Sequence, residues 1–265
     1  MAIRFFIGLG MALLAHGSAT AQGQTYAVVV GISDYRFLSN QNGDLRFADR
    51  DAQQVTAFLQ SKLGGRVPAG QIRLLTNQRA TQANIRQALT VFRQAKSGDR
   101  VILYFSGHGL PDSFVPYDVR PGDRRNLLTY GDIKAAFRQS AASTKLCIAD
   151  ACLAGGLQRP QTGPGSPAQT LTGPTHAPGE RGNVALLLAG RSTQAAIEDG
   201  RLAGGAFTYH LLRGLTGGAD RNADRIVTIR ELHQYVAPRV RQASRGRQTP
   251  IFYGRFSDKL ALAYL

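Results

Sequence analysis

Residues 100–109 read RVILYFSGHG, and residues 145–156 read KLCIADACLAGG. Each segment opens with a continuous apolar run, which is typical of a strand buried on both faces of a parallel sheet. The first run leads into a histidine flanked by glycines at 107 and 109, and the second leads into Cys152, which is soon followed by glycines. Ligands bind outside the carboxyl ends of the strands in such sheets, so we expect His108 and Cys152 to lie there.

The chain on either side of these two segments alternates between predicted strands and predicted helices. Strands are expected at 25–30, 72–75, 100–105, 145–150 and 184–189, with one or two more in 250–265. Helices are expected at 44–59, from Thr81 with Ile85, Leu89 and Phe92 facing inward, and at 130–138, 206–215 and 228–241. This alternation predicts an α/β fold with a mostly parallel sheet and helices on both faces.

The N-terminal segment has the pattern of a secretory signal peptide. One positive charge at Arg4 precedes an apolar core at Phe5–Ala15, and Ala19-Thr20-Ala21 forms a small-residue cleavage site before Gln22. We therefore expect residues 1–21 to be a signal peptide, and the protein to be exported to the periplasm or secreted. No apolar run reaches the roughly 18 residues of a membrane span, which excludes a polytopic membrane protein.

The 265 residues, 43% of them hydrophobic, suffice for one large or two small domains. We predict one domain over 22–265, interrupted by a flexible loop at 155–183 that is rich in proline and glycine and has almost no large apolar side chain.

The formal charge of +15 could indicate a nucleic-acid partner. The arginines are scattered singly, however, so we expect no specific nucleic-acid site and assign the charge to a solvated surface.

The chain holds two cysteines, Cys147 and Cys152. Export favours disulfides, but five residues of largely extended chain span about 16 Å, whereas the Cα atoms of a disulfide lie within about 7 Å of each other. We therefore predict that Cys147 is a small core residue and that Cys152 is a free thiol. A thiol beside an imidazole is the minimal arrangement for nucleophilic catalysis, because the histidine activates the thiol and later protonates the leaving amine.

Several segments, spread over most of the mature chain, resemble the caspase and metacaspase family of cysteine peptidases. They are Gly31–Tyr35, Asp51-Ala52, Ala80-Thr81, Tyr104–Gly109, Val115–Asp118, Asp150–Cys152 and Gly205–Thr208. The resemblance implies a caspase-like fold with a six-stranded sheet, and proteins or peptides as substrates. It also implies that His108 and Cys152 form a catalytic dyad, with the backbone N–H groups of Gly109 and Cys152 as an oxyanion hole.

The same resemblance implies a substrate pocket for a basic side chain. Asp150 matches the acidic pocket residue that stands two positions before the nucleophile in metacaspases, Asp51 matches a second pocket carboxylate, and Ser106 matches a pocket serine. Independently, Asp51 lies on the apolar stripe of its predicted helix, which is unusual for a carboxylate without a partner. Two carboxylates bind arginine bidentately, so we predict cleavage after Arg or Lys and not after Asp. The alternative is that each is a structural aspartate, paired in a salt bridge or placed in the first turn of a helix.

Two further features have simpler alternatives. Arg159 and Arg181 lie in the predicted loop and are candidate self-processing sites, although the loop is alternatively a plain linker. Asp220, Asn222, Asp224 and Glu231 have the spacing of a calcium-binding loop, but Arg225 stands where that loop requires glycine. We favour a capping box from Thr228 to Glu231 and expect no required cofactor.

Two other functions compete with a peptidase. A cysteine-based phosphatase needs five residues between its cysteine and its arginine, and six separate Cys152 from Arg159, so that class is excluded. The remaining alternative is a caspase-like interaction module that has lost catalysis. The presence of both His108 and Cys152 favours the enzyme.

Overall fold

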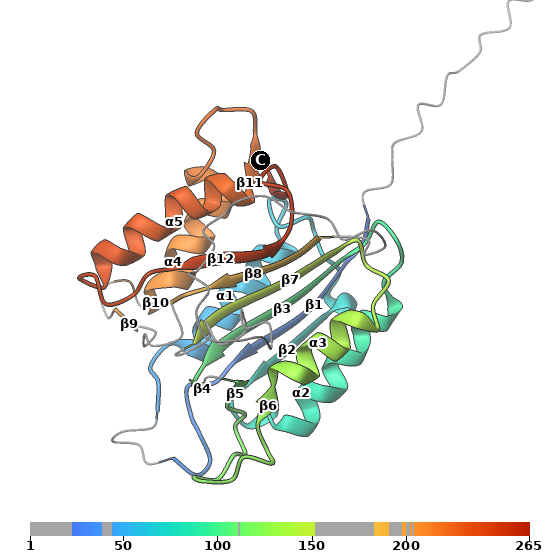
Figure 1. Ribbon diagram of the computed structural model, residues 1–265, viewed down its shortest axis with the longest axis vertical. Helices are drawn as coiled ribbons and strands as arrows, with labels where there is room; N and C mark the ends of the chain where they lie inside the picture. The colour runs from blue at the N-terminus through green and yellow to red at the C-terminus, as the bar shows by residue number, and fades with distance from the viewer. Residues whose placement is uncertain are drawn as a thin grey trace, which may run out of the picture.

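The computed structural model describes residues 23–38, 44–110, 112–151, 183–190, 198–199, 202 and 204–265. A six-stranded sheet runs through the molecule in the order β12-β8-β7-β3-β1-β2 (Figure 1). Its strands are β1 (Thr25–Gly31), β2 (Ile72–Thr76), β3 (Arg100–Gly107), β7 (Thr144–Ala151), β8 (Asn183–Leu188) and β12 (Ile251–Arg255). All neighbours pair in parallel except β12, which is antiparallel to β8. The predicted fold class is confirmed.

Helices cover both faces of this sheet. They are α1 (Ala48–Gln60), α2 (Gln82–Leu89), α3 (Tyr130–Arg138), α4 (Ala206–Arg213) and α5 (Ile229–Ala243). One apolar cluster joins α2 and α3 to alternate strand residues such as Phe105, and we call this side the α2/α3 face. A second cluster joins α1, α4 and α5 to the intervening residues such as Tyr104, and we call it the α1/α4 face.

The helix starts follow the capping residues in the sequence. The side chains of Thr81, Thr129 and Thr228 each accept a hydrogen bond from a backbone N–H in the first turn, and Thr129 and Thr228 complete capping boxes with Asp132 and Glu231. The helix predicted to begin at Asp44 begins at Ala48 instead. The reason is that Asp44 accepts a hydrogen bond from the Tyr35 N–H and Leu45 donates to Ser33, which ties this segment to the loop after β1.

The sequence did not predict most of the short strands. A three-stranded sheet consists of β4 (Gly109–Leu110), β5 (Ser113–Phe114) and β6 (Leu128–Thr129), and two-stranded sheets join β9 (Glu198–Asp199) to β10 (Gly204–Gly205) and β11 (Ile226–Thr228) to β13 (Ala261–Tyr264). Strands of two or three residues carry too few positions for a periodic pattern. Also, Asn183 opens β8 rather than closing the predicted loop, and α4 ends at Arg213 and leads into a π-helical turn at Gly214–Gly218.

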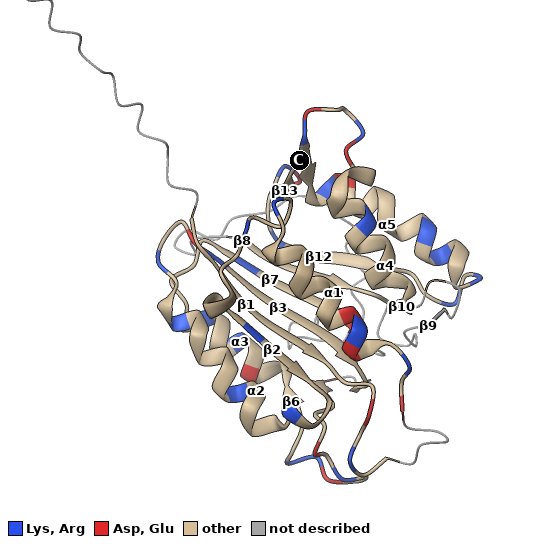
Figure 2. Cartoon of the chain, turned by 180° about the vertical axis from the view of Figure 1, so that it is seen from behind, with Lys and Arg blue, Asp and Glu red and all other residues tan. Residues whose placement is uncertain are grey.

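The structure tests the predictions for the membrane spans, Cys147 and the distribution of positive charge, but not those for the N-terminal segment and most of the predicted loop. The proposed signal peptide and residues 155–182 of the proposed loop lie outside the described residues. Within the described part, no helix is both long enough and apolar enough to cross a membrane. Cys147 is a free, fully buried thiol whose burial raises its pKa to about 12, which confirms it as a core residue. Lys and Arg lie on several helices and loops rather than on one element (Figure 2).

Candidate active site

The carboxyl ends of β1, β3 and β7 meet at one edge of the sheet. In register, Gly31 of β1 pairs with Ser106 of β3, which in turn pairs with Asp150 of β7. One position further, Gly107 pairs with Ala151, so His108 follows β3 beside the end of β7. Cys152, Arg159 and Arg181 lie outside the described residues.

Tyr35, in the loop after β1, holds the start of the histidine segment. The backbone N–H of His108 donates to the Tyr35 hydroxyl at 2.7 Å, and the two rings lie 4.8 Å apart between centroids. Gly107 has φ +156°, and a Cβ at this position would lie 2.7 Å from the Tyr35 hydroxyl oxygen. Glycine at 107 therefore permits both the backbone turn and the close approach of Tyr35.

Gly109 presents its N–H away from the small sheet. The Val115 N–H donates to the His108 carbonyl at 3.0 Å, while the His108 N–H donates to Tyr35, so these two residues share one of the two bonds of a hydrogen-bonded pair. The next antiparallel pair, Gly109 and Phe114, is therefore of the non-hydrogen-bonded kind, whose N–H groups point outward from the pair. An N–H in this position can donate to a bound carbonyl oxygen.

The two predicted pocket carboxylates converge at the start of α4. The Gly205 N–H donates to Asp51 Oδ2 at 2.9 Å, and the Thr208 N–H donates to Asp150 Oδ2 at 3.1 Å. Both side chains are buried, with residue exposures of 2% and 4%. Gly205 is the N-cap and Thr208 the third residue of α4, so the partial positive charge of the helix N-terminus stabilises both anions.

Two hydroxyl groups, those of Thr208 and Tyr104, form a chain of hydrogen bonds that ends at the Asp150 carboxylate. The Thr208 hydroxyl donates to Asp150 Oδ2 at 2.7 Å, so the Tyr104 hydroxyl, 2.6 Å from the Thr208 oxygen, is the donor to Thr208. Burial, together with the charges of Asp51 and Asp150, raises the pKa of Tyr104 well above its ordinary value. The phenol therefore keeps its proton. Ser106 is also buried and is paired in register with Asp150.

The sequence alone did not indicate a role for Tyr35, Tyr104, Gly205 or Thr208. A signal for all four was present, because each lies in a segment that resembles the family. The sequence did not indicate the hydrogen-bond partners of these residues, because the partners are distant in the chain. Gly205 donates to Asp51 across 154 residues, and His108 donates to Tyr35 across 73.

The predicted calcium-binding residues form a loop of local contacts. Asp220 accepts from the Arg225 N–H, Asp224 accepts from the Ile226 N–H, and Asn222 and Asp224 hydrogen-bond each other. The Glu231 carboxylate accepts from the N–H and hydroxyl of Thr228, as a capping box requires. Among the described residues, no group of three or more His, Cys, Asp or Glu is arranged to hold a metal ion.

The fold and this edge of the sheet together define the class of protein. A mostly parallel six-stranded sheet, with a glycine-flanked histidine and a buried aspartate pair at its carboxyl edge, is a caspase-like arrangement. The chain belongs to the caspase-domain family of cysteine-type peptidases, since the sequence profile described as "Caspase domain" matches residues 24–261.

Individual proteins that are similar to the chain include one curated relative and one solved structure. A probable protease from a Desulfuromonadales bacterium is 28% identical over 152 residues, and the match covers 49% of the chain but 18% of that protein. The chain thus spans a minor part of this relative's length. The crystal structure of protein GSU0716 from Geobacter sulfurreducens superposes with a TM-score of 0.59 at 18% identity, covering 88% of the chain and 94% of that structure, which supports the fold.

The glycine at the start of α4 gives a first prediction. A Cβ at Gly205 would overlap Asp150 Oδ2 and lie 2.9 Å from Asp51 Oδ2, although its φ of −63° suits alanine. We expect Gly205→Ala to lower the free energy of unfolding by about 1–3 kcal/mol through overpacking, and to displace the carboxylates. Thermal unfolding measures the loss. Gly131→Ala in α3, where the new Cβ would be 3.4 Å from Thr129 Oγ1, is the matched control and is expected to keep wild-type stability. Equal stability of both variants would contradict the described carboxylate positions.

Proposed function

We propose that the chain is a cysteine endopeptidase in which Cys152 is the nucleophile and His108 its general base and acid. The observation that carries this proposal is the register of β3 and β7: Gly107 and Ala151 are paired Cα positions, and they directly precede His108 and Cys152. Paired strands lie about 4.8 Å apart, so two side chains that follow such a pair start from neighbouring positions.

The reaction follows from the roles of these two side chains. His108 takes the proton of the Cys152 thiol as sulfur attacks the scissile carbonyl carbon, and the N–H groups of Gly109 and Cys152 stabilise the oxyanion. The C–N bond then breaks, and His108 gives its proton to the departing amine. Water, deprotonated by His108, hydrolyses the thioester and restores the thiol.

We further propose that the substrate residue before the scissile bond is Arg or Lys. The supporting observation is the convergence of Asp51 and Asp150 at one buried position beside Ser106. Two neighbouring buried carboxylates repel each other unless donors or a cation offset their charge. The start of α4 supplies donors to one oxygen of each carboxylate, and a guanidinium or ammonium group supplies the cation.

A peptide library that varies the residue before the scissile bond tests this function, with Cys152→Ala as the blank. We expect turnover of Arg and Lys peptides, none of Asp peptides, and none by the blank. The competing function, an inactive interaction module, predicts no turnover of any library member. Faster cleavage after Asp than after Arg would contradict the proposed specificity while leaving the dyad intact.

We propose that activity needs no added calcium. Both oxygens of Asp224 and one oxygen each of Asp220 and Glu231 already accept hydrogen bonds within the loop and the capping box, and the positive Arg225 lies among them. We expect kcat/KM with an arginine peptide to be the same in a chelator as in millimolar Ca²⁺. A strong activation that Asp224→Asn abolishes would show instead that this loop is a calcium site.

If the chain is its own substrate, we expect one molecule to cleave another after Arg181 rather than to cleave itself. Arg181 stands two residues before Asn183, which starts β8 beside Thr144 and donates to the Ser143 carbonyl at 2.7 Å. Thr144 and Ala151 are the two ends of β7, about 23 Å apart, and the catalytic edge lies at Ala151. We expect Cys152→Ala protein to remain one chain alone and to be cut when active protein is added. Cutting at a rate independent of concentration would contradict this expectation. The same mixing experiment reports on Arg159.

We also propose export with removal of residues 1–21. N-terminal sequencing of the protein from its native host is expected to begin near Gln22. A sequence that begins at Met1 on exported protein would contradict the proposal.

A further inference from the structure

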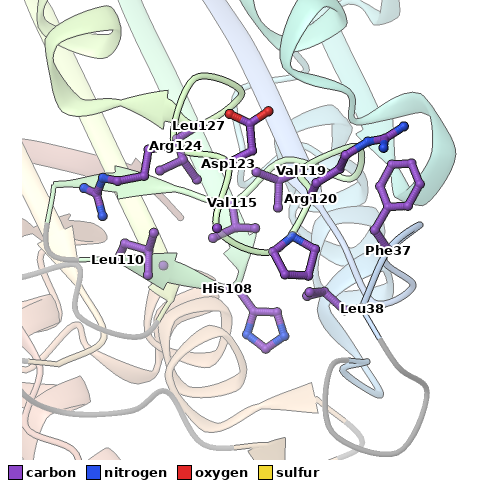
Figure 3. Close-up of a pocket in the computed structure, with 13 residues that line it drawn as sticks. Phe37, Leu38, His108, Leu110, Val115, Val119, Arg120, Asp123, Arg124 and Leu127 are labelled. Carbon is purple, nitrogen blue, oxygen red and sulfur yellow. The ribbon is translucent and has the colours of Figure 1, made fainter.

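A hollow of about 870 Å³ lies beside His108, on the side of the loop that joins β5 to β6 (Figure 3). Its apolar wall consists of Leu38, Leu110, Val115, Val119 and Leu127, and its rim carries Arg120 and Arg124. The size is within the range of about 300–1,000 Å³ that is usual for ligand pockets. His108 and Gly109, which the proposed mechanism uses, line one part of this hollow, whereas its apolar wall and its arginines have no role in the steps proposed above.

The hollow and the carboxylate pair lie on opposite faces of the sheet. Val115, Val119 and Leu127 belong to the apolar cluster of the α2/α3 face, and Leu38 and Leu110 pack against that cluster. Asp51 and Asp150 meet the start of α4, on the α1/α4 face. His108 directly follows β3, two residues after Ser106, which is paired in register with Asp150, and it lines the hollow.

The chemistry of peptide cleavage determines on which side of His108 the substrate residues before and after the scissile bond lie. The residue before the scissile bond sends its side chain toward the carboxylates. The imidazole must reach the nitrogen of the leaving amine in order to protonate it. The residues that follow this nitrogen therefore continue beyond His108, away from the carboxylates and toward the hollow.

The charges on the rim favour an acidic partner. Arg124 is paired with Asp112 at 2.7 Å, and Asp123 with Arg125 at 3.2 Å. Arg120 lies with its guanidinium 4.7 Å from the centroid of the Phe37 ring and makes no ion pair with a described residue. Asp123 also lines the hollow, and the charge of Arg120 contributes to lowering the pKa of that carboxyl, but Asp123 is already paired with Arg125, so among the described residues the positive charge of Arg120 is offset only in part.

We propose that this hollow binds the leaving-group side of the substrate: an apolar side chain directly after the scissile bond, followed by an acidic residue that meets Arg120. The proposal rests on the peptidase function proposed above and adds a second specificity to it. Its substrate is a peptide with a basic residue, a large aliphatic residue and an acidic residue in that order.

Four substrates separate this proposal from the function on which it rests. Three quenched fluorescent peptides are identical up to the arginine and continue with Leu-Glu, Gly-Glu or Leu-Lys. The fourth is an acyl-arginine methyl ester, whose leaving group is methanol and leaves the hollow empty. We expect kcat/KM for Leu-Glu to exceed that for Gly-Glu by about tenfold or more, and that for Leu-Lys by about threefold.

Two variants locate the effect. Arg120→Glu is expected to invert the ratio of Leu-Glu to Leu-Lys turnover, whereas Arg73→Glu, an equal charge change on the exposed edge strand β2, is expected to leave the ratio as in the wild type. Leu110→Gln is expected to bring the Leu-Glu rate down toward the Gly-Glu rate.

The outcomes are distinguishable. Hydrolysis of the methyl ester with equal rates for the three peptides, or a preference for Gly-Glu or Leu-Lys, would overturn the inference and leave the peptidase function standing. Failure to hydrolyse all four substrates would overturn both.

Discussion

His108→Ala is expected to lower kcat for an arginine peptide by about 10²–10⁴-fold, the usual contribution of a general acid–base group. The loss arises because nothing then takes the thiol proton or delivers one to the leaving amine. Stability is expected to change little, because the Tyr35 hydroxyl accepts its hydrogen bond from the backbone N–H of residue 108, which alanine retains. Steady-state kinetics and thermal unfolding on the same preparation check both parts.

His210→Ala is the control for this variant. His210 is a half-buried residue of α4 whose ring meets the Tyr209 ring edge to face, outside the proposed site. We expect it to retain the wild-type kcat. An active His108→Ala enzyme would remove histidine from the proposed mechanism, and an unfolded one would be resolved by His108→Gln, which keeps a polar side chain of similar size.

Asp150→Asn is expected to reduce the preference for arginine over citrulline, its uncharged analogue of the same shape. Losing one partner of a buried, hydrogen-bonded charge pair costs about 2–5 kcal/mol. We therefore expect kcat/KM for the arginine peptide to fall by roughly 100-fold or more, while the citrulline peptide changes little. Thr208 can still donate to the remaining amide oxygen, so the side chain keeps its position.

This comparison separates specificity from structure. If Asp150 only holds the start of α4, Asp150→Asn lowers stability and affects both peptides alike. Asp99→Asn provides the matched control, because Asp99 is a buried carboxylate that accepts the N–H groups of Gln24 and Lys96 far from the site. Asp99→Asn is expected to cost stability with an unchanged arginine-to-citrulline ratio.

The sequence predicted the parts of the fold that local physics determines. The apolar runs of β1, β3 and β7 and the capping threonines at 81 and 228 carried enough signal to place strands and helix starts. The short strands around Gly109 and Gly204 did not, because each has only two residues, too few for a periodic pattern, although their partner strands are close in sequence.

The candidate site divides in the same way. The pairing of β3 with β7 places His108 beside Ala151. This proximity could be predicted from the sequence, because two predicted parallel strands each lead directly into a reactive residue. The donors that hold Asp51 and Asp150 come from α4, and Tyr104 reaches Thr208 across 104 residues of chain. Such contacts have no local pattern, and they emerge only when α1, β7 and α4 pack on one face.

The proposed function depends on a reactive Cys152 thiol that His108 activates and toward which a basic substrate side chain directs the scissile bond. Its most direct test is covalent labelling with an acyloxymethyl ketone built on arginine, read by intact mass and peptide mapping. We expect one label per chain, on Cys152, much slower labelling of His108→Ala, and none on Cys147, whose burial raises its pKa to about 12. An unlabelled protein, or faster labelling by the corresponding aspartate ketone, would contradict it.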